Sequence, residues 1–515
     1  MARLTLNKIN VIRDINEDEQ SIKTIDKFIF YILLVAIAII PLLIGAHTAL
    51  FVSPDISGSG VSGTAYQTDI FTYFKFVALV ILTIATIILF LYKLLFLNYK
   101  FKKDKVIYAI YAFIFFLLVS VIFSEYKTIA IWGMHNRHDG AITYICFAML
   151  MLIALNIKYP KNALKIVTYA LYPFIWINII IALMTFYGKN IMLNETIHKI
   201  LTIFDKSGVT FDERSILTGT LNQWNYMSGM SSIMVMIFLT LAIFQDSMRL
   251  RIINLLTALA AFATLLVSMS SSGFLSVAVM TLLMLVALFL KGNKKRGLLL
   301  FMSFLLIASL QIGILSTKNP KVWNESLGMF VKTNPFTKIE GALELFDNKT
   351  YAADKKLELP VLPERGYAAG SGRIYIWSTM LELISERPLY GYGMDTILFH
   401  FPQNNLEKRA ELWDEKGLVD KPHNMYLGIL WGTGILGFLA FIIMLIIFTL
   451  PILKTIYKKS SKTNSYFVAL SMGFGAFLIQ AIFNDSVIGL TTAPLLIVTI
   501  LYTVNKNEEL VGEKT

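Results

Sequence analysis

Apolar runs long enough to cross a lipid bilayer recur along nearly the whole chain, and they restrict it to a membrane fold. A spanning helix needs ~20 mostly apolar residues. Only 16% of the residues are charged, whereas about a quarter are charged in a soluble protein. We therefore expect an all-α polytopic membrane protein with about 12 transmembrane helices. The candidate spans are 28–46, 71–92, 106–123, 140–157, 163–187, 224–244, 252–269, 273–290, 298–315, 424–450, 465–483 and 486–503.

One long polar segment interrupts the spans and divides the chain into three parts. Residues 1–315 form a membrane domain with spans 1–9, and residues 424–515 hold spans 10–12 and a tail. The segment between them, 316–423, is long enough for an extramembrane domain. Apolar residues recur there at helical spacing, which predicts an amphipathic helix lying on the bundle. They are Ile374, Trp377, Leu381 and Ile384.

Basic residues in short loops predict the orientation. If all twelve spans are correct, the lysine-rich loops share one side with the N-terminus, and such loops stay cytoplasmic. Both termini are then cytoplasmic, the loop 316–423 is extracytoplasmic, and the protein lies in the cytoplasmic (plasma) membrane. The net charge of +12 reflects this topology and an attraction to the anionic headgroups of the lipid bilayer. It gives no reason to invoke nucleic acid as a partner.

Several other classes of function find little support. The sequence has no phosphate-binding P-loop pattern and no cytoplasmic segment that could house an ATPase. The single cysteine, Cys146, excludes an internal disulfide. Apart from Lys75, the spans lack the buried charges that ion-coupled transporters carry at membrane depth. This counts against transport without excluding it.

Arginine and histidine gather on the predicted outer side. All six histidines fall there, and arginine is the side chain suited to bidentate binding of phosphate. The alternative is that arginine merely decorates these loops. The outer arginines are Arg137, Arg214, Arg365, Arg373, Arg387 and Arg409.

Two outer stretches combine polar groups with the start of a span. His135 and His138, in the stretch 132–140, could share a metal ion, but no third ligand is evident, so a polar helix entrance is favoured. Asn222 and Asn225 enter the sixth span one helical turn apart, after Arg214. Such a helix N-terminus favours anions. An ordinary helix cap followed by an interfacial tryptophan explains it equally well.

The long polar segment supplies two further candidate sites, one within it and one where it meets the tenth span. Arg373 lies in the first turn of the predicted amphipathic helix, a rigid place from which to bind an anion. His423 and Asn424 stand at the head of the tenth span. A histidine at the water–lipid boundary can act as acid, base or hydrogen-bond donor.

In this order and topology, these stretches resemble the O-antigen ligase and O-antigen polymerase superfamily. The layout is similar over nearly the whole chain, whereas the motifs lie mainly in 370–440. The motifs are Arg373-x-x-x-Trp377, Arg387-Pro388-Leu389-Tyr390-Gly391-Tyr392-Gly393, His423-Asn424-Met425-Tyr426-Leu427 and Gly434-Ile435-Leu436-Gly437, with Trp132-Gly133…Arg137…Gly140 and Gly219-Thr220-Leu221-Asn222 upstream.

The resemblance implies a GT-C-like membrane glycosyltransferase with a large extracytoplasmic loop. Such an enzyme transfers an undecaprenyl-diphosphate-linked glycan to an acceptor glycan or glycolipid, or to a growing chain, on the outer membrane face. It is metal-independent and inverting, uses no cofactor, and works beside other polysaccharide-assembly proteins. The alternatives are a lipid-linked oligosaccharide flippase or exporter, which would need a polar path through the bundle, and a membrane scaffold.

Carried over residue by residue, the resemblance makes Arg373 the diphosphate-binding arginine and His423 the essential histidine, both counted as catalytic. The sequence does not decide whether His423 bonds the diphosphate or takes the acceptor's proton, and Glu364, Asp395 or Asp420 are alternative bases. The expected substrate-binding residues are Arg137, Arg214, Asn222, Asn225, Trp377 and Asn424, and no metal site is expected. The chain departs from many relatives at Ser270-Ser271-Ser272-Gly273, where no arginine follows the serines. Either another arginine compensates, or the carrier or acceptor differs.

Overall fold

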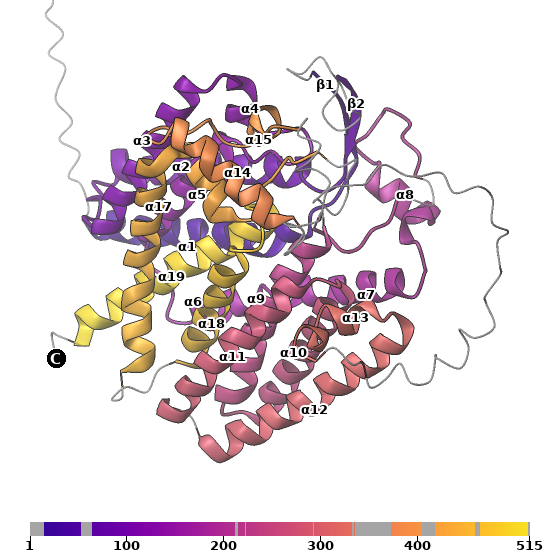
Figure 1. The fold of residues 1–515 in the computed structure, drawn as a ribbon. Helices are drawn as coiled ribbons and strands as arrows, with labels where there is room; N and C mark the ends of the chain where they lie inside the picture. Colours follow the sequence, from indigo (N-terminus) through magenta and orange to yellow (C-terminus); the bar gives the residue numbers. More distant parts are fainter. Residues whose placement is uncertain are drawn as a thin grey trace, which may run out of the picture.

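A bundle of long apolar helices makes up most of the protein (Figure 1). The computed structural model describes residues 15–52, 64–211, 215–221, 223–291, 293–331, 334, 372–403, 418–458 and 464–512. Within these ranges, ten helices are long and apolar enough to cross a membrane. The all-α polytopic fold is therefore confirmed. The long helices are α1 (Ile15–Ile39), α2 (Tyr73–Phe96), α3 (Lys105–Phe123), α6 (Ala163–Tyr169) continued by α7 (Tyr172–Phe186), α9 (Trp224–Phe244), α10 (Met248–Val267), α11 (Ser271–Lys291), α12 (Lys294–Lys318), α17 (Met425–Tyr457) and α19 (Ile488–Gly512).

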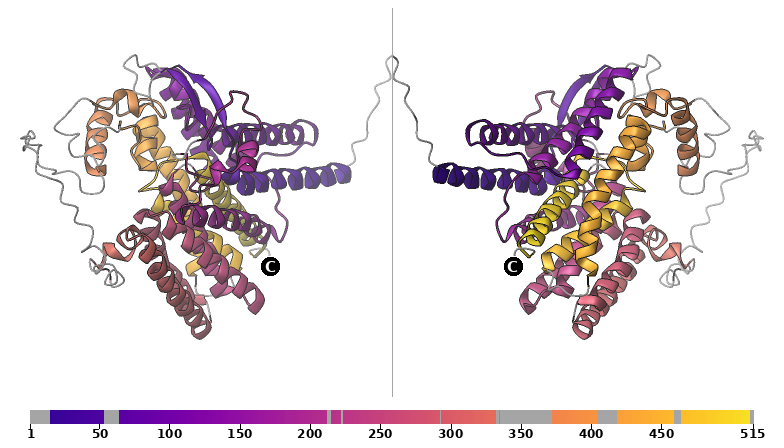
Figure 2. Two further views of the ribbon diagram at one scale, coloured as in Figure 1. Left: turned by 90° about the vertical axis from the view of Figure 1, so that its right-hand side faces the viewer. Right: turned by 90° about the vertical axis from the view of Figure 1, so that its left-hand side faces the viewer.

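The other two predicted spans are helices too, but short ones. Helix α5 (Ala141–Leu155) has 15 residues and α18 (Ser465–Gln480) has 16. Both are apolar but fall below the length of a full span. The first predicted span differs at its start, because α1 begins at Ile15 rather than near residue 28. Acidic residues in the first turn, Glu17 and Asp18, favour this extension by complementing the helix dipole, and Figure 2 shows α1 projecting beyond the other helices.

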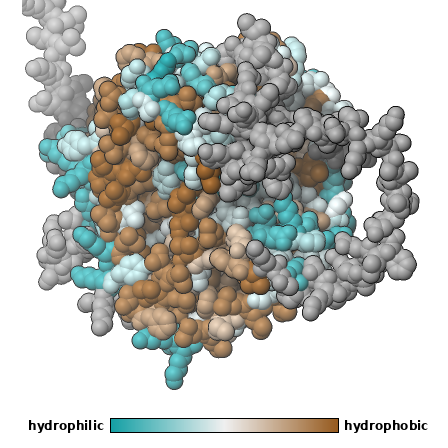
Figure 3. Space-filling view, in the orientation of Figure 1, coloured by the Kyte–Doolittle hydropathy of each residue, from teal (hydrophilic) through white to brown (hydrophobic). Residues whose placement is uncertain are grey.

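Helices α9 and α19 form the centre of the bundle. In the most apolar 18-residue stretch of each of these two helices, 94% of the stretch is buried. The corresponding stretches of α12 and α2 are only 28% and 33% buried. Helix α9 packs against α10, α11 and α18, and its buried face includes small residues such as Ser228, Gly229 and Ser232. Small residues allow helices to approach closely in a membrane. The outer helices leave apolar side chains exposed, and apolar residues cover much of the face seen in Figure 3.

Short elements gather at one end of the bundle. A hairpin of β1 (His47–Phe51) and β2 (Ala65–Asp69) pairs antiparallel with His47 opposite Asp69. Near it lie α4 (Lys127–Trp132), which leads into α5, and α15 (Ile397–His400). The remaining short helices are α8 (Glu195–Leu201), α13 (Lys321–Asn324) and α14 (Arg373–Glu386), with 3-10 turns at Ile40–Leu42, Ile191–Leu193 and Leu327–Met329.

The predicted amphipathic helix is present as α14, but its predicted buried face is partly wrong. Ile384 is buried as expected, whereas Ile374 and Leu381 are about half exposed. Tyr375 and Met380 are buried instead. The reason is that Tyr375 packs edge-on against the ring of Phe401, the residue that follows α15. This contact turns the Tyr375 face of the helix toward Phe401.

The glycine motif after α14, residues 388–393, forms backbone hydrogen bonds with α17 where that helix is interrupted at Gly434. Gly434 has φ +68° and ψ −176° inside this helix, which releases backbone groups that lipid cannot satisfy. The segment 388–393 satisfies them: Tyr392 N donates to Trp431 O (2.9 Å), and Ile435 N donates to Pro388 O (2.7 Å). A Cβ on Gly391 would lie 2.3 Å from Trp431 O. The two glycine motifs in the sequence are thus two sides of one contact.

Candidate functional site

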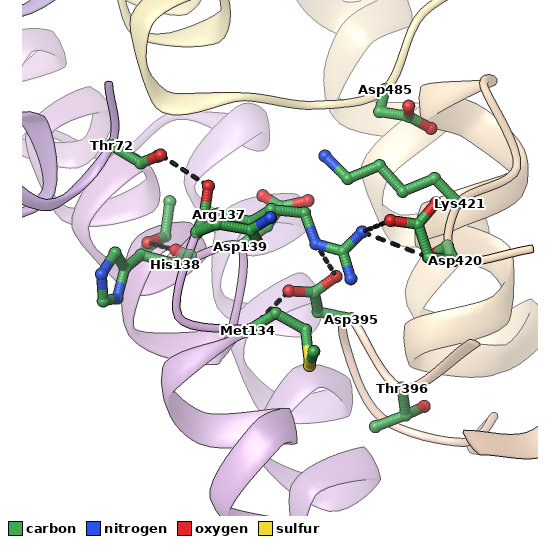
Figure 4. Close-up of polar contacts among 12 residues, drawn as sticks. Thr72, Met134, Arg137, His138, Asp139, Asp395, Thr396, Asp420, Lys421 and Asp485 are labelled. Carbon is green, nitrogen blue, oxygen red and sulfur yellow. Dashed lines mark hydrogen bonds and ion pairs between the residues drawn. The ribbon is translucent and has the colours of Figure 1, made fainter. Parts of the chain in front are cut away.

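Four segments far apart in sequence meet at the end of the bundle that carries the hairpin. They are 133–140 before α5, 393–396 before α15, 418–424 before α17, and 484–489 before α19. Each precedes a helix, so the helix starts and the loops together position the charged side chains drawn in Figure 4.

Arg137 lies at the centre of this arrangement and is held by two carboxylates. Its Nε is 3.1 Å from Asp395 Oδ1, and its Nη1 is 2.6 Å from Asp420 Oδ2. Asp395 also accepts a hydrogen bond from Met134 N (2.7 Å). Burial alone would lower the pKa of Arg137, but the two carboxylates raise it above its ordinary value, so the guanidinium stays charged.

Three residues at this end adopt left-handed backbone conformations that are unfavourable for side chains other than glycine. They are His138 (φ +51°), Asp395 (φ +59°) and His423 (φ +51°). Each costs roughly 1–3 kcal/mol and persists only where surrounding contacts fix it. Such strain concentrates at functional sites, and here it coincides with the charged cluster.

His423 forms a pair with a buried aspartate. Its Nδ1 is 3.0 Å from Asp485 Oδ2, which also accepts a hydrogen bond from Tyr226 Oη (3.1 Å). Lys421 Nζ donates to Tyr226 Oη (3.2 Å). Burial would raise the pKa of Asp485, but the neighbouring His423 and Lys421 lower it, so Asp485 is a carboxylate. About a third of the His423 side chain is exposed. A carboxylate on Nδ1 fixes the ring and leaves Nε2 for other chemistry.

Arg373 reaches the same segment from α14. Its Nη2 donates to Phe483 O at 3.2 Å, whereas its buried Nε has no hydrogen-bond partner. Asn484 Oδ1 and Asp485 Oδ1 are also buried without partners. Burial lowers the pKa of Arg373, opposed by Asp485 and Glu325. Because buried polar groups are nearly always paired, unpaired groups on Arg373 and on the segment 484–485 next to its partner Phe483 favour a polar ligand here.

The predicted residues Trp377 and Asn424 hold the segment that carries His423. Trp377 Nε1 donates to Pro422 O at 2.7 Å. Asn424 Oδ1 caps α17 by accepting from Leu427 N at 3.0 Å. Asn225 is half-buried in the first turn of α9, next to Tyr226. Arg214 and Asn222 lie outside the described residues.

Two small cavities of opposite character adjoin these side chains. One is lined by Lys75, Arg137 and Lys421, together with the first residues of α19, Ile488 and Gly489. Lys75 Nζ is itself fixed by three carbonyl oxygens, those of Leu43, Phe71 and Thr220, at 2.5, 2.6 and 2.8 Å.

The second cavity is acidic. Its lining includes Asp139, Asp395, Asp420 and Asp485, and Lys421 lines both cavities. Burial raises the pKa of Asp139 well above its usual range, so this carboxyl tends to be neutral. The molecule thus places a cationic and an acidic compartment on either side of one lysine.

The histidines suspected of metal binding point to other partners. His138 stacks on Phe76 with ring centroids 4.8 Å apart, and burial lowers its pKa to about 4. His135 Nε2 lies 3.0 Å from Gln67 O. In the described part of the chain, no group of three histidine, cysteine or carboxylate side chains could hold a metal ion.

The serine stretch without an arginine also borders the site. Ser271 N donates to Glu325 Oε2 (3.2 Å), and Asn484 Nδ2 donates to Ser272 Oγ (3.4 Å). Arg373 is close enough to Glu325 for their charges to interact. Arg373 therefore brings a guanidinium toward the stretch that lacks its own.

Sequence reasoning missed Asp485, Lys421, Tyr226 and Asp139. The available signal was Asp485 itself, a lone carboxylate in the short gap between the last two apolar runs, where charge is costly and usually functional.

A helical polytopic membrane protein with a buried, partly unpaired charged site at one end is the class that fold and site define. Comparison with protein families supports the resemblance to the O-antigen ligase superfamily, because residues 256–442 match the O-antigen ligase family. The match runs from α10 into α17 and includes Arg373 and His423. No curated protein matches the sequence. The match supports, at the level of the family, a membrane glycan ligase or polymerase.

Proposed function

We propose that this protein transfers a glycan from undecaprenyl diphosphate to an acceptor glycoconjugate or a growing chain, without a metal and with inversion at the anomeric carbon. The observation that carries the proposal is that the His423–Asp485 pair and Arg373 meet at segment 483–485, where Arg373 Nε and Asp485 Oδ1 are buried without hydrogen-bond partners. A lipid diphosphate is already an activated leaving group, so the protein has only to position two substrates and stabilise developing charge.

In the proposed reaction, an acceptor hydroxyl attacks the anomeric carbon as the bond from that carbon to the diphosphate oxygen breaks. His423 takes the hydroxyl proton on Nε2, and Asp485 orients the ring and stabilises the imidazolium that forms. This is the division of labour of a carboxylate–histidine pair. Arg373 neutralises the departing diphosphate. Attack from the face opposite the leaving group in one displacement gives inversion.

The two cavities suit the two substrates. Lys421 and the positive N-terminal end of α19 favour a diphosphate in the cationic cavity. Carboxylates accept hydrogen bonds from sugar hydroxyls, so the acidic cavity suits the acceptor. Arg137 lines the cationic cavity, but its bonds to Asp395 and Asp420 favour a role in positioning. Asn225, Arg214 and Asn222 remain predicted substrate contacts.

The distribution of lysines supports an outward-facing site. Lys100, Lys102 and Lys103 lie between α2 and α3, and Lys105 begins α3, at the far end of α2 from the site. Basic loops stay cytoplasmic. We therefore assign the site to the outer face of the cytoplasmic membrane, both termini to the cytoplasm, and 316–423 to an extracytoplasmic domain between membrane domains 1–315 and 424–515.

The flippase alternative is disfavoured by where charge is buried. A flippase needs a polar path through the bundle, whereas the buried cations of the described spans lie near helix ends: Lys75 beside the site, and Lys93 and Arg251 near the ends of α2 and α10 away from it.

The deciding experiment is an in vitro transfer assay with the purified protein, undecaprenyl-diphosphate glycan and candidate acceptors, comparing the wild type with His423→Ala. Transfer by the wild type and none by the variant supports the proposal. A ladder of repeats identifies a polymerase, and a single shift of the acceptor identifies a ligase. Binding of the donor without transfer to any acceptor would favour the flippase.

A further inference from the structure

A basic cavity lies at the end of the bundle opposite the candidate site. Helices α2 and α19 each begin at the site, where Lys75 and Gly489 line the cationic cavity. The C-terminal part of α19 lines the basic cavity with Lys506 and Asn507, and the basic segment after α2 supplies Lys103. The 24 residues of α2 correspond to a helix of about 36 Å. This is enough to place the two cavities at opposite membrane surfaces.

The lining of this cavity carries more positive than negative charge. Lys102, Lys103 and Lys506 face one carboxylate, Asp104. Lys506 Nζ is 2.7 Å from Asp104 Oδ2, and Tyr502 Oη donates to Asp104 Oδ1 (3.0 Å), so Asp104 is matched by Lys506. The charges of Lys102 and Lys103 remain uncompensated within the lining. The cavity is therefore attractive to an anion.

Two lysine ammonium groups at this cavity differ in how firmly they are held. Lys102 Nζ donates to Leu155 O (3.0 Å) and Ile157 O (3.2 Å), at the C-terminal end of α5. These two bonds hold the ammonium in place, and an ammonium has three N–H donors, so one remains. Lys103 is exposed. A phosphoryl group at the cavity mouth could therefore accept hydrogen bonds from Lys102, whose ammonium is held in place, and from Lys103, which is exposed.

The neighbouring surface points to a lipid as the source of the anion. The last turn of α2, which leads into this basic segment, exposes Leu95 (72%) and Phe96 (63%). Exposed apolar side chains in the helical turn that precedes a basic cavity suit an acyl chain with its headgroup, and basic pockets between spanning helices bind anionic headgroups on the cytoplasmic side. We infer that this cavity binds the phosphoryl group of an anionic phospholipid, independently of the proposed glycan transfer.

The test measures binding to the full-length protein in a neutral detergent. Phosphatidylglycerol, phosphatidylcholine and inorganic phosphate are titrated separately, and bound ligand is counted by native mass spectrometry. We expect saturable binding of phosphatidylglycerol. Lys103→Gln with Lys506→Gln should weaken it by roughly 30-fold, because each lysine contributes a similar factor. The matched control is Lys294→Gln with Lys295→Gln, exposed lysines at the start of α12, and it should bind like the wild type.

Lys103→Gln alone keeps the test decisive if the double variant fails to fold, because it leaves the Lys506–Asp104 pair intact. We expect a loss of about 5-fold from this single change. Equal competition by inorganic phosphate would support the anion site but assign it to a soluble phosphate. Unchanged affinity in the Lys103 variants, or equal binding of phosphatidylcholine, would overturn the proposal. None of these outcomes depends on transfer activity.

Discussion

Both ends of the bundle bury an aspartate beside a cationic partner, but only the aspartate at the candidate site has an oxygen without a hydrogen-bond partner. At the end away from the site, Lys93 Nζ bonds Asp26 (2.5 Å) and Asn156 O (2.9 Å), and the other Asp26 oxygen accepts from Lys158 N (2.9 Å). At the candidate site, Asp485 Oδ1 and Arg373 Nε have no partner. The completed network ties helices together, whereas the incomplete one is suited to a ligand.

Removing the carboxylate from the incomplete pair is expected to give the largest effect. Asp485→Asn keeps the shape of the side chain but loses the charge that orients His423. A fall in kcat of up to ~10⁴-fold is expected, with the KM for donor little changed, because Asp485 acts through His423. Steady-state kinetics of glycan transfer measure both. A rise in KM with kcat preserved would mean that Asp485 only contacts substrate.

Removing the guanidinium of Arg373, in the first turn of α14, should give the second-largest effect. Arg373→Ala is expected to lower the transfer rate by about 10²–10³-fold, the loss typical of one charge-stabilising donor. The matched control is Arg387→Ala, since Arg387 lies at the other end of α14 and pairs with Glu125 on the surface. Full transfer by Arg373→Ala would remove its role toward the diphosphate.

A substitution in the completed Lys93–Asp26 network should lower the stability of the protein and leave its transfer activity unchanged. Lys93→Met leaves Asp26 buried without its cation and is expected to lower the free energy of unfolding by about 3–5 kcal/mol. Chemical unfolding in detergent measures this. Transfer per folded molecule should match the wild type. A selective loss of activity in well-folded protein would break the distinction between the two ends.

The backbone contact between the glycine motifs provides a smaller, local test. Gly434→Ala places a Cβ at φ +68° and 2.5 Å from Leu389 O, so a loss of roughly 1–3 kcal/mol in stability is expected. Gly428→Ala, in the same helix, meets nothing closer than Pro422 Cγ at 3.6 Å and should be neutral or slightly stabilising. Thermal unfolding compares the two, and equal effects would contradict the contact.

The smallest effect should come from Asp139 and should depend on pH. Its pKa is raised by burial, so the folded protein holds this proton more tightly than the unfolded chain does. Stability is therefore lost as the pH rises above the unfolded value of 3.8. Asp139→Asn removes this dependence, and its stability relative to the wild type should grow with pH. A difference that shrinks as pH rises would contradict the raised pKa.

The sequence predicted the helices better than the contacts among them. Apolar runs are a local signal, and every predicted span contains a helix. The structure brings the predicted residues Arg373 and His423 to one segment, 483–485, whereas their roles stay predictions. The contact of His423 with Asp485 and those of Arg137 with Asp395 and Asp420 were not predicted, because they join segments that are distant in sequence. The same limit explains the wrong face of α14, which Phe401 sets from outside the helix.

The break in α17 also limits how the site can open. Separating segment 388–393 from the break would leave the carbonyl oxygens of Trp431 and Gly432 and the N–H of Ile435 bare in a lipid environment, at several kcal/mol for each group. The C-terminal end of α14 and the upper half of α17 must therefore travel together whenever a bulky donor enters. Arg373 and His423 then approach or leave the donor as one body, so their spacing survives the opening of the site.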